Sequence, residues 1–153
     1  MKNISPKLPL TTEERTNLRK NKVKLREIAQ MDLVQLSEIL KTTYERAKYL
    51  RGLAQFQSVP SIGPKIAEHV VGLGFYSLDE IKNEEADLVN RFEQQKGFWT
   101  DPCVEDSFRC IVYYANHPDS DKSWFDFTSE RKRYREQHGY PATRPATPWY
   151  IES

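Results

Sequence analysis

The sequence predicts an all-α fold, because apolar residues recur at helical spacing and helix-capping residues stand in front of most of these segments. No stretch between turn residues alternates apolar and polar side chains as a β-strand would. Of the 153 residues, 38% are hydrophobic and 12% aromatic, which suits a packed core rather than a disordered chain. We therefore expect residues 1–153 to form a single domain.

Capping and stop residues set the expected helices. Thr11 and Glu14 form a capping box, Pro64 suits the first position of a helix, and Asp101 stands directly before Pro102 as a cap. The last segment, after Gly139, contains three prolines and is expected to be extended. In order, we expect helices from Thr11 through Ile28, from Asp32 to Leu40, from Thr42 with Glu45 to before Pro60, from Pro64 to Gly74, from Ser77 with Glu80 through Ile81, over Glu84–Gln95 to Gly97, from Asp101 to before Pro118, and from Ser129 to His138.

Charge is unevenly distributed along a chain whose formal net charge is only +1. Residues 1–51 carry 12 Lys and Arg against six Asp and Glu, whereas residues 79–121 carry four against 11. Residues 52–78 are neutral overall, and residues 122–153 carry a small positive excess. Such asymmetry indicates a basic contact face and a separate acidic region, although ordinary solvated helix faces would give the same pattern.

The strongest local pattern lies around residues 56–67, where an apolar helix end is followed by Val59-Pro60-Ser61-Ile62-Gly63-Pro64-Lys65. A glycine-containing turn that opens a helix presents backbone N–H groups at the positive end of that helix, which suits a phosphate. Lys65, in the first turn of the new helix, adds a cation. Ile62 is expected to insert into the core. A plain helical packing unit is the alternative.

This segment resembles the helix-hairpin-helix motif of DNA-binding proteins, in which an apolar residue is followed by Pro-Gly-Ile-Gly and, four positions on, by Ala. Ala67 stands at that last position, and Ser61 replaces the first glycine. If that position needs a positive φ, a serine costs about 1 kcal/mol or more. The resemblance implies phosphate contacts by Ser61, Gly63, Pro64, Lys65 and Ile66. We expect no cofactor, apart from a monovalent cation that could bind at the hairpin.

The preceding segment resembles a degenerate copy of the same motif, with helix, short turn, helix and Ala47 after the turn. Its turn lacks glycine, so a weaker hold on phosphate is expected. Paired hairpins of this kind form a compact helical unit that contacts both strands of a duplex. The resemblance implies a core over residues 24–82, with the second hairpin at 53–82 and a C-terminal extension and tail over 83–153.

The chain as a whole resembles the pathogenicity-locus family of small bacterial helix-hairpin-helix proteins. The resemblance covers roughly residues 25–150. It implies a fold more than an activity. It rests on the hairpin segment, Leu73-Gly74-Phe75-Tyr76-Ser77-Leu78, Asp101-Pro102-Cys103-Val104-Glu105-Asp106-Ser107-Phe108-Arg109, Trp124-Phe125-Asp126-Phe127-Thr128-Ser129-Glu130-Arg131-Lys132 and Gly139-Tyr140-Pro141.

Two other patterns are candidates for a metal or disulfide site and for a catalytic pair. Cys103, Cys110 and His117 recur every seven residues, but seven helical residues rise about 10.5 Å, too far for one zinc ion or one disulfide. We therefore interpret both cysteines as small apolar side chains and expect no metal. Lys65 and Asp101 resemble the lysine and aspartate of base-excision DNA glycosylases, although Asp101 is equally explained as a helix cap.

The basic segment near the C-terminus places Arg131 and Arg135 one helical turn apart, followed by Tyr140 and Trp149. These side chains suggest a second backbone-contacting surface with aromatics that stack on bases. The alternative is that the aromatics fix the proline-rich tail to the core.

Our leading hypothesis is a non-enzymatic DNA-binding protein that contacts backbone phosphates of duplex or branched DNA without reading base sequence, in an accessory role in DNA repair, recombination or maintenance. A protein-interaction module with structural hairpins is the second hypothesis, and a glycosylase-like enzyme the third. Two cysteines and no apolar run long enough for a membrane span favour the cytoplasm and no membrane partner. Besides the hairpin, the expected DNA contacts are Lys22, Lys24, Arg26, Arg131 and Arg135.

Overall fold

The computed structural model describes residues 5–84 and 87–151, and in these ranges the protein is all-α, as predicted. The chain divides into two compact units, the first ending at Glu80 and the second beginning at Ile81. No helix within the described ranges is long and apolar enough to cross a membrane.

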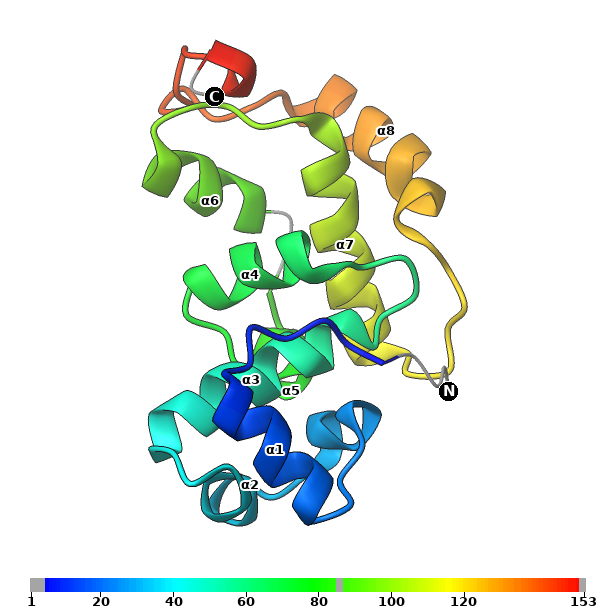
Figure 1. Ribbon diagram of the computed structural model, residues 1–153. Helices are drawn as coiled ribbons and strands as arrows, with labels where there is room; N and C mark the ends of the chain where they lie inside the picture. Colours follow the sequence, from blue (N-terminus) through cyan, green and yellow to red (C-terminus); the bar gives the residue numbers. More distant parts are fainter. Residues whose placement is uncertain (1–4, 85–86, 152–153) are drawn as a thin grey trace. The chain divides into compact units, whose positions relative to one another are not determined.

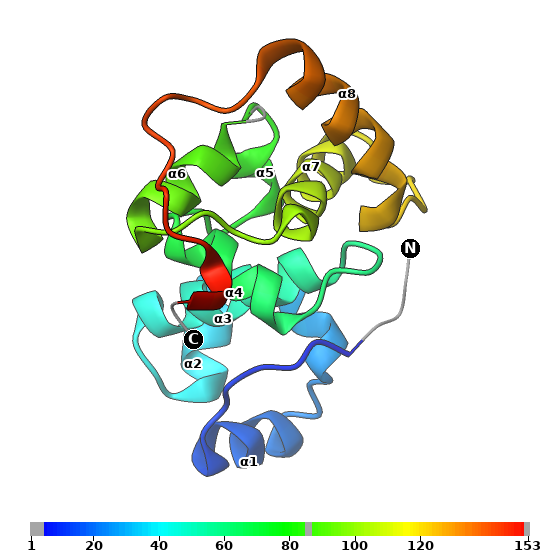
Figure 2. The same cartoon turned by 90° about the horizontal axis from the view of Figure 1, so that it is seen from above.

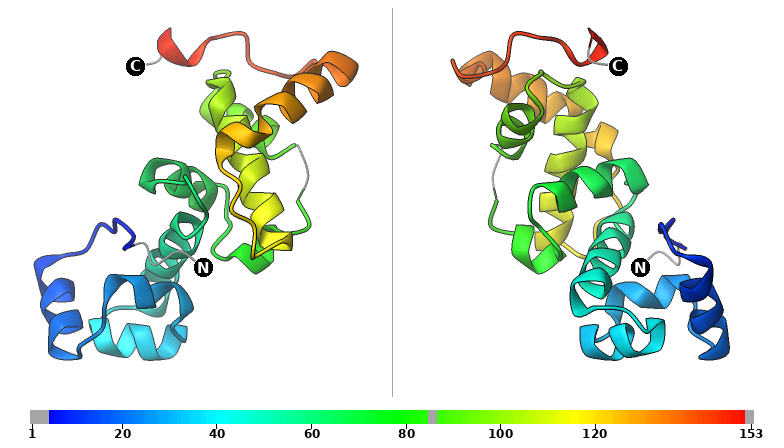
Figure 3. Two further views of the ribbon diagram at one scale, coloured as in Figure 1. Left: turned by 90° about the vertical axis from the view of Figure 1, so that its right-hand side faces the viewer. Right: turned by 60° about the vertical axis from the view of Figure 1, so that its left-hand side comes forward.

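The first unit is built around one central helix, α3 (Tyr44–Gln57), which contacts η1, α2 and α4 (Figures 1 and 3). The core of this unit includes Leu36 of α2 and Leu50 and Phe56 of α3, each with no exposed surface. α3 also buries Gly52 and Gln57, outside the apolar repeat, as expected of a helix that packs against several neighbours. The other elements of this unit are α1 (Thr12–Lys20), the 3₁₀ helix η1 (Leu25–Gln30), α2 (Leu33–Leu40) and α4 (Pro64–Gly72), and the short α5 (Leu78–Ile81) spans the boundary at residue 80.

The first expected helix is shorter than predicted. The Thr11–Glu14 capping box is present, but α1 ends at Lys20 instead of continuing to Ile28. Lys22 has a φ of 56°, and the amide of Val23 donates to the carbonyl of Leu18 at 2.9 Å. This bond ends the helix in a left-handed turn of the kind that usually contains glycine, but the sequence has no glycine here. The chain then resumes as the 3₁₀ helix η1, which buries Ile28 completely.

The start of α3 also differs from the prediction by one residue. Thr43, not Thr42, is the N-cap, and its hydroxyl accepts the amide of Arg46 at 3.1 Å. The caps expected at Asp32 and at Pro64 are confirmed: Asp32 accepts the amide of Gln35, and Pro64 is the first residue of α4.

Two polar contacts tie the N-terminal segment to α3. Arg46 donates to both carboxylate oxygens of the buried Glu14, at 3.2 and 3.0 Å, and so joins α1 to α3. The side-chain amide of Gln57 exchanges two hydrogen bonds of 2.9 Å with the backbone of Lys7. The first unit therefore extends N-terminally beyond the hairpin core expected from residue 24.

The second unit packs α7 (Pro102–Asn116) against α6 (Leu88–Lys96), α8 (Thr128–His138) and the 3₁₀ helix η2 (Trp124–Phe127) (Figure 2). Phe92 of α6 meets Phe108 of α7 edge to face, with ring centroids 5.7 Å apart. The cap at Asp101 is confirmed, and its carboxylate accepts the amide of Cys103 at 3.0 Å.

The acidic segment forms a helix later than expected. α6 begins at Leu88 rather than at Glu84, and residues 85 and 86 of the prediction lie outside the described residues. The stop at Gly97 is confirmed by its φ of 81°. The last helix is confirmed within one residue, since α8 spans Thr128–His138 and is followed by Gly139 at a φ of 64°.

The proline-rich tail is held along the segment that joins α6 to α7 (Figure 1). The amide of Trp99 donates to the carbonyl of Thr147, and the amide of Trp149 donates to the carbonyl of Trp99, both at 2.8 Å. The tail ends in a short 3₁₀ helix, η3 (Trp149–Ile151), where Tyr150 meets Trp99 edge to face. These contacts fix the tail to its own unit.

Candidate nucleic-acid interface

The turn between α3 and α4 is the first candidate for binding phosphate. α3 ends at Gln57, and the chain turns through Pro60 and Ser61 before Gly63 serves as the N-cap of α4. The amide of Ile62 donates to the carbonyl of Val59 at 3.1 Å, and the Ile62 side chain is buried as predicted. The turn is thus fixed to the core by an apolar residue while its outer side stays in solvent.

Ser61 adopts the left-handed conformation, with a φ of 70°. This is the positive φ at which, as noted from the sequence, a serine is less favourable than the glycine of the helix-hairpin-helix motif. Gly63, in contrast, is extended, with φ −95° and ψ −175°, so its backbone is one that any residue can adopt. A Cβ at Gly63 would meet nothing within 4 Å. The missing side chain therefore leaves open space at the amino end of α4 rather than relieving strain.

The amino end of α4 is suited to an anion. Gly63, the N-cap, has no side chain with which to cap the helix, and Pro64 at the first position has no N–H to satisfy. The amides of Lys65 and Ile66 belong to the first turn, where N–H groups lack partners within a helix and the helix dipole is positive. Lys65 is exposed and Ile66 half-buried, so the cation lies at the edge of this helix end.

The preceding turn, between α2 and α3, repeats this arrangement. Lys41 has a φ of 56° and stands two residues before the N-cap Thr43, as Ser61 stands two residues before Gly63. Ala47 and Ala67, four residues after each cap, are completely buried. Both turns use α3, which is the second helix of the first turn and the first helix of the next. The repeat differs at the cap, because the Thr43 hydroxyl already occupies one amide of α3.

The predicted basic contacts of the N-terminal region are all exposed. Lys22, Lys24 and Arg26 lie between the end of α1 and the middle of η1. Lys20 and Lys41 line an open groove of about 300 Å³ together with Thr12, Glu13, Thr16 and Asn17. The groove is held by a hydrogen bond of 3.1 Å from the Asn17 side chain to the carbonyl of Leu40. The first unit therefore presents several lysines and arginines to solvent on adjoining elements.

Arg131 and Arg135 have a different environment from the one that we expected. Arg131 Nε donates to Asp106 at 2.6 Å, and Arg135 Nε lies 3.1 Å from Glu105. Their side chains are only 13% and 9% exposed. Because each guanidinium is mostly buried on a carboxylate, neither contributes an open positive surface.

These ion pairs belong to a buried cluster that sequence reasoning missed. Glu105 accepts from Arg109 at 2.9 Å as well as from Arg135, and Glu93 of α6 accepts from Arg144 of the tail at 2.9 and 3.1 Å. The carboxylates come from α6 and α7, and the arginines from α7, α8 and the tail. No local signal marked them, because Glu105 and Asp106 point about 100° apart on the helix and Asp106 lies opposite the apolar stripe of Val104, Phe108 and Ile111.

Tyr140 connects the arginines of this cluster. The guanidinium of Arg144 lies 3.6 Å from the centre of its ring, and that of Arg135 lies 4.1 Å away. Burial, followed by the charge of Glu105, raises the pKa of the Tyr140 hydroxyl above its usual value. The tail aromatics near the basic helix thus bind arginines of their own unit, which agrees with the alternative that they fix the tail.

The cysteines and Asp101, which the sequence singled out, have environments explained by burial and helix capping. Burial raises the pKa of both Cys103 and Cys110 to about 11, so neither thiol is activated as a nucleophile or ligand. Across the described ranges, no three His, Cys, Asp or Glu side chains gather as a metal site would require. The pKa of Asp101 is lowered, first by its hydrogen bonds to Cys103, as expected of a helix cap.

Comparison with known proteins assigns a family. The model of the family described as Cdd1, pathogenicity locus, matches residues 50–133. The match runs from the middle of α3 into α8 and includes the α3–α4 turn. No curated protein and no solved structure matches the chain. The chain therefore belongs to the pathogenicity-locus family.

Proposed function

We propose that this member of the pathogenicity-locus family binds the sugar-phosphate backbone of DNA without reading base sequence, using the α3–α4 turn as its anchor. The observation that carries the proposal is the amino end of α4. There the N-cap Gly63 has no side chain to occupy the first amides or the space beside them, and the exposed Lys65 lies in the first turn of the same helix. Backbone N–H groups at a helix start and a neighbouring lysine are the groups that phosphate contacts use.

The basic residues of the first unit extend this proposed contact. Lys22, Lys24 and Arg26 are exposed, and Lys20 and Lys41 share one groove. Phosphate contacts by several such cations give binding that weakens steeply with salt. We leave Arg131 and Arg135 out of the proposed interface, because Asp106 and Glu105 already neutralise them.

The likeness of the α3–α4 turn to a helix-hairpin-helix motif supports the proposal, and the left-handed Ser61 fits the position where that motif has glycine. With this role goes a cytoplasmic location, as part of the proposal, where the two thiols would stay reduced. An accessory task in DNA repair, recombination or maintenance follows from backbone binding that is indifferent to sequence.

Fluorescence anisotropy with duplex, forked and single-stranded oligonucleotides at two salt concentrations tests the proposal. We expect binding at low salt, equal affinity for unrelated sequences, and a weaker complex for Lys65→Glu, with the slope of log affinity against log salt reduced by about one. Lys132→Glu is the matched control, since it makes the same charge change at an exposed position of α8. The proposal fails if the protein does not bind at low salt, or if both variants bind alike.

A protein-interaction module is the second candidate. The excess of acidic residues over 79–121 and the ion-paired arginines of α8 favour it, because they reduce the positive surface of the second unit. Recovery of a nuclease or repair protein in a pull-down, together with no affinity for any oligonucleotide, would select this candidate over DNA binding.

The glycosylase-like alternative has a separate test. It predicts abasic or nicked product from damaged duplex, lost in Asp101→Asn. Asp101 is engaged as the cap of α7, so nothing about this residue calls for a catalytic role.

A further inference from the structure

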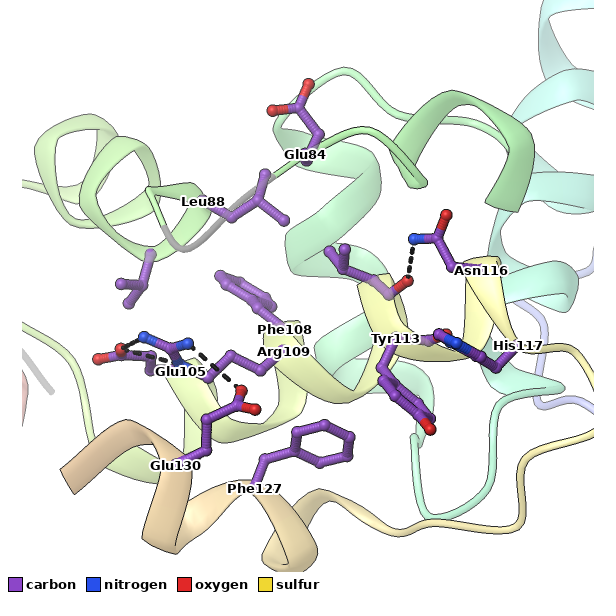
Figure 4. A pocket seen from close by; sticks show the side chains of 12 residues that line it. Glu84, Leu88, Glu105, Phe108, Arg109, Tyr113, Asn116, His117, Phe127 and Glu130 are labelled. Carbon is purple, nitrogen blue, oxygen red and sulfur yellow. Dashed lines mark hydrogen bonds and ion pairs between the residues drawn. The ribbon is translucent and has the colours of Figure 1, made fainter. Parts of the chain in front are cut away.

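A hollow of about 290 Å³ lies between α6, α7 and η2 in the second unit (Figure 4). Its walls carry three carboxylates, those of Glu84, Glu105 and Glu130, and one guanidinium, that of Arg109. Arg109 already pairs with Glu105 at 2.9 Å and with Glu130 at 3.5 Å. Because the charges that line it are negative on balance, this hollow disfavours the phosphates of a nucleic acid.

The groove of the first unit has the opposite balance of charge. Lys20 and Lys41 line it together with a single carboxylate, that of Glu13, and neither lysine forms an ion pair within the described residues. Lys41 belongs to the α2–α3 turn, so the groove continues the surface of that turn. A nucleic-acid strand that leaves the proposed α3–α4 contact therefore meets cations here.

The helix end at the α2–α3 turn is not suited to phosphate, in contrast to the one at the α3–α4 turn. The Thr43 hydroxyl accepts the amide of Arg46 at 3.1 Å, whereas the cap of α4, Gly63, has no side chain. Two residues after the cap stands Glu45 in α3 but Lys65 in α4. A carboxylate at this place repels phosphate. The two turns therefore differ in the chemical group that they accept.

The α2–α3 turn presents an aromatic ring instead, that of Tyr44, the first residue of α3. This side chain is 49% exposed. The other exposed aromatic side chains of the described residues, Phe125, Tyr134, Trp149 and Tyr150, each meet a neighbouring ring. Tyr44 meets neither a ring nor a cation in the described part of the chain. Exposed rings beside cations are the groups on which proteins stack the bases of single strands.

We propose that Tyr44 stacks on an unpaired base while the α3–α4 turn holds the backbone of the adjoining duplex, so that the protein prefers forked DNA to blunt duplex. The inference rests on the DNA binding proposed above and names the DNA structure that it favours. α3 separates the two turns (Figure 1), and its 14 residues correspond to about 21 Å. Since a strand rises about 3.4 Å per nucleotide, about six nucleotides span this distance. Lys20 and Lys41 supply cations for their phosphates.

Three oligonucleotides with the same duplex sequence test this preference by fluorescence anisotropy with the full chain. They are a blunt duplex, a fork with unpaired arms of about eight nucleotides, and the same fork with abasic arms. The abasic fork keeps the phosphates and lacks the bases. We expect the intact fork to bind about fivefold more tightly than the abasic fork, or more, because a stacked base adds to the affinity. Equal affinities for the two forks would overturn the inference.

Substitutions of the exposed ring assign the effect to Tyr44. Tyr44→Ala should weaken binding of the intact fork about fivefold or more and leave the affinities for the blunt duplex and the abasic fork unchanged. Tyr44→Phe keeps the ring and should bind as the wild type does. Phe125→Ala is the matched control, since it removes an exposed ring of the second unit. No loss in Tyr44→Ala, an equal loss for all three oligonucleotides, or the same loss in Phe125→Ala would contradict the assignment.

The stacking role and the proposed DNA binding fail in different ways. If the blunt duplex binds, and binds more weakly to Lys65→Glu, while the two forks bind alike, only the stacking role is wrong. If no oligonucleotide binds at low salt, both are wrong.

Discussion

Lys41 and Ser61 occupy equivalent places in consecutive turns, each in the left-handed conformation and each two residues before a helix cap. Their φ angles are 56° and 70°. Neither is the glycine that this conformation favours, and a non-glycine residue there costs about 1–2 kcal/mol. The two turns therefore enter the next helix alike, with a left-handed residue two before the cap and a buried alanine four after it, but they leave the previous helix differently, since Lys41 directly follows α2 and three residues separate α3 from Ser61.

Replacing Ser61 by Gly should stabilise the protein by about 1 kcal/mol, because glycine removes the steric cost at positive φ. Chemical denaturation, with the free energy of unfolding taken from the midpoint and slope, measures the effect. If the turn is the proposed phosphate contact, DNA affinity should be retained or increased.

Ser58→Gly is the control for that substitution. Ser58 lies in the same connection but has a φ of −74°, where glycine offers no steric gain. Here the greater flexibility of the unfolded chain and the loss of the 2.6 Å hydrogen bond from the Ser58 hydroxyl to the carbonyl of Gln55 should both lower the free energy of unfolding. Equal effects of the two substitutions would show that Ser61 is unstrained.

Arg131→Ala should destabilise the protein by about 3 kcal/mol or more. Asp106 is 1% exposed, and removal of its guanidinium partner leaves a buried carboxylate whose remaining side-chain contact is the Thr128 hydroxyl at 2.8 Å. The neighbouring Lys132→Ala provides the comparison, since Lys132 is exposed and its loss should change the free energy of unfolding by no more than about 0.5 kcal/mol. Similar losses in both variants would contradict the buried pairing.

Acid should loosen the contact between α1 and α3. The hydrogen bonds from Arg46 are the largest cause of a pKa for Glu14 below its ordinary value of 4.5. A carboxylate with a lowered folded-state pKa contributes stability that is present above pH 4.5 and is lost as the pH falls through the folded pKa. The free energy of unfolding, measured at successive pH values below 5, should therefore decrease more steeply with falling pH for the wild type than for Glu14→Gln. Parallel curves would exclude this linkage.

Both cysteines should react slowly with iodoacetamide in the native protein. Since the thiolate is the reactive form, raising the pKa from 9.0 to about 11 lowers its population about 100-fold at neutral pH. Mass spectrometry of native and urea-unfolded samples measures the difference in alkylation. Fast labelling of native Cys103, the less buried of the two, would show that its thiol is more acidic than this environment implies.

Most helices could be predicted from the sequence because their ends are set by local chemistry. Asp32, Asp101 and Gly97 act within one turn of themselves, and all three behave as their residue types predict. The break after α1 could not be predicted, because it places a lysine, Lys22, at a positive φ. The 3₁₀ helix that follows the break buries Ile28 completely.

The roles of charged residues were harder to predict than the helices. Arg131 and Lys132 are adjacent and equally basic in sequence, yet one is buried on Asp106 and the other is exposed. Which arginine finds a carboxylate depends on how α8 packs on α7, a long-range relationship with no local pattern. The adjacent Glu105 and Asp106 gave no hint, because they point about 100° apart on the helix and look like surface carboxylates in the sequence.

The ion pair between Arg144 of the tail and Glu93 of α6 has a practical consequence for the design of shorter fragments of this protein. A fragment cut to the family match, residues 50–133, would begin inside α3 and end inside α8. It would lack Arg135 and Arg144, which leaves Glu105 with one guanidinium and Glu93 with none. The stretch of sequence that family members share is therefore smaller than the stretch that must be expressed for either unit to hold its shape.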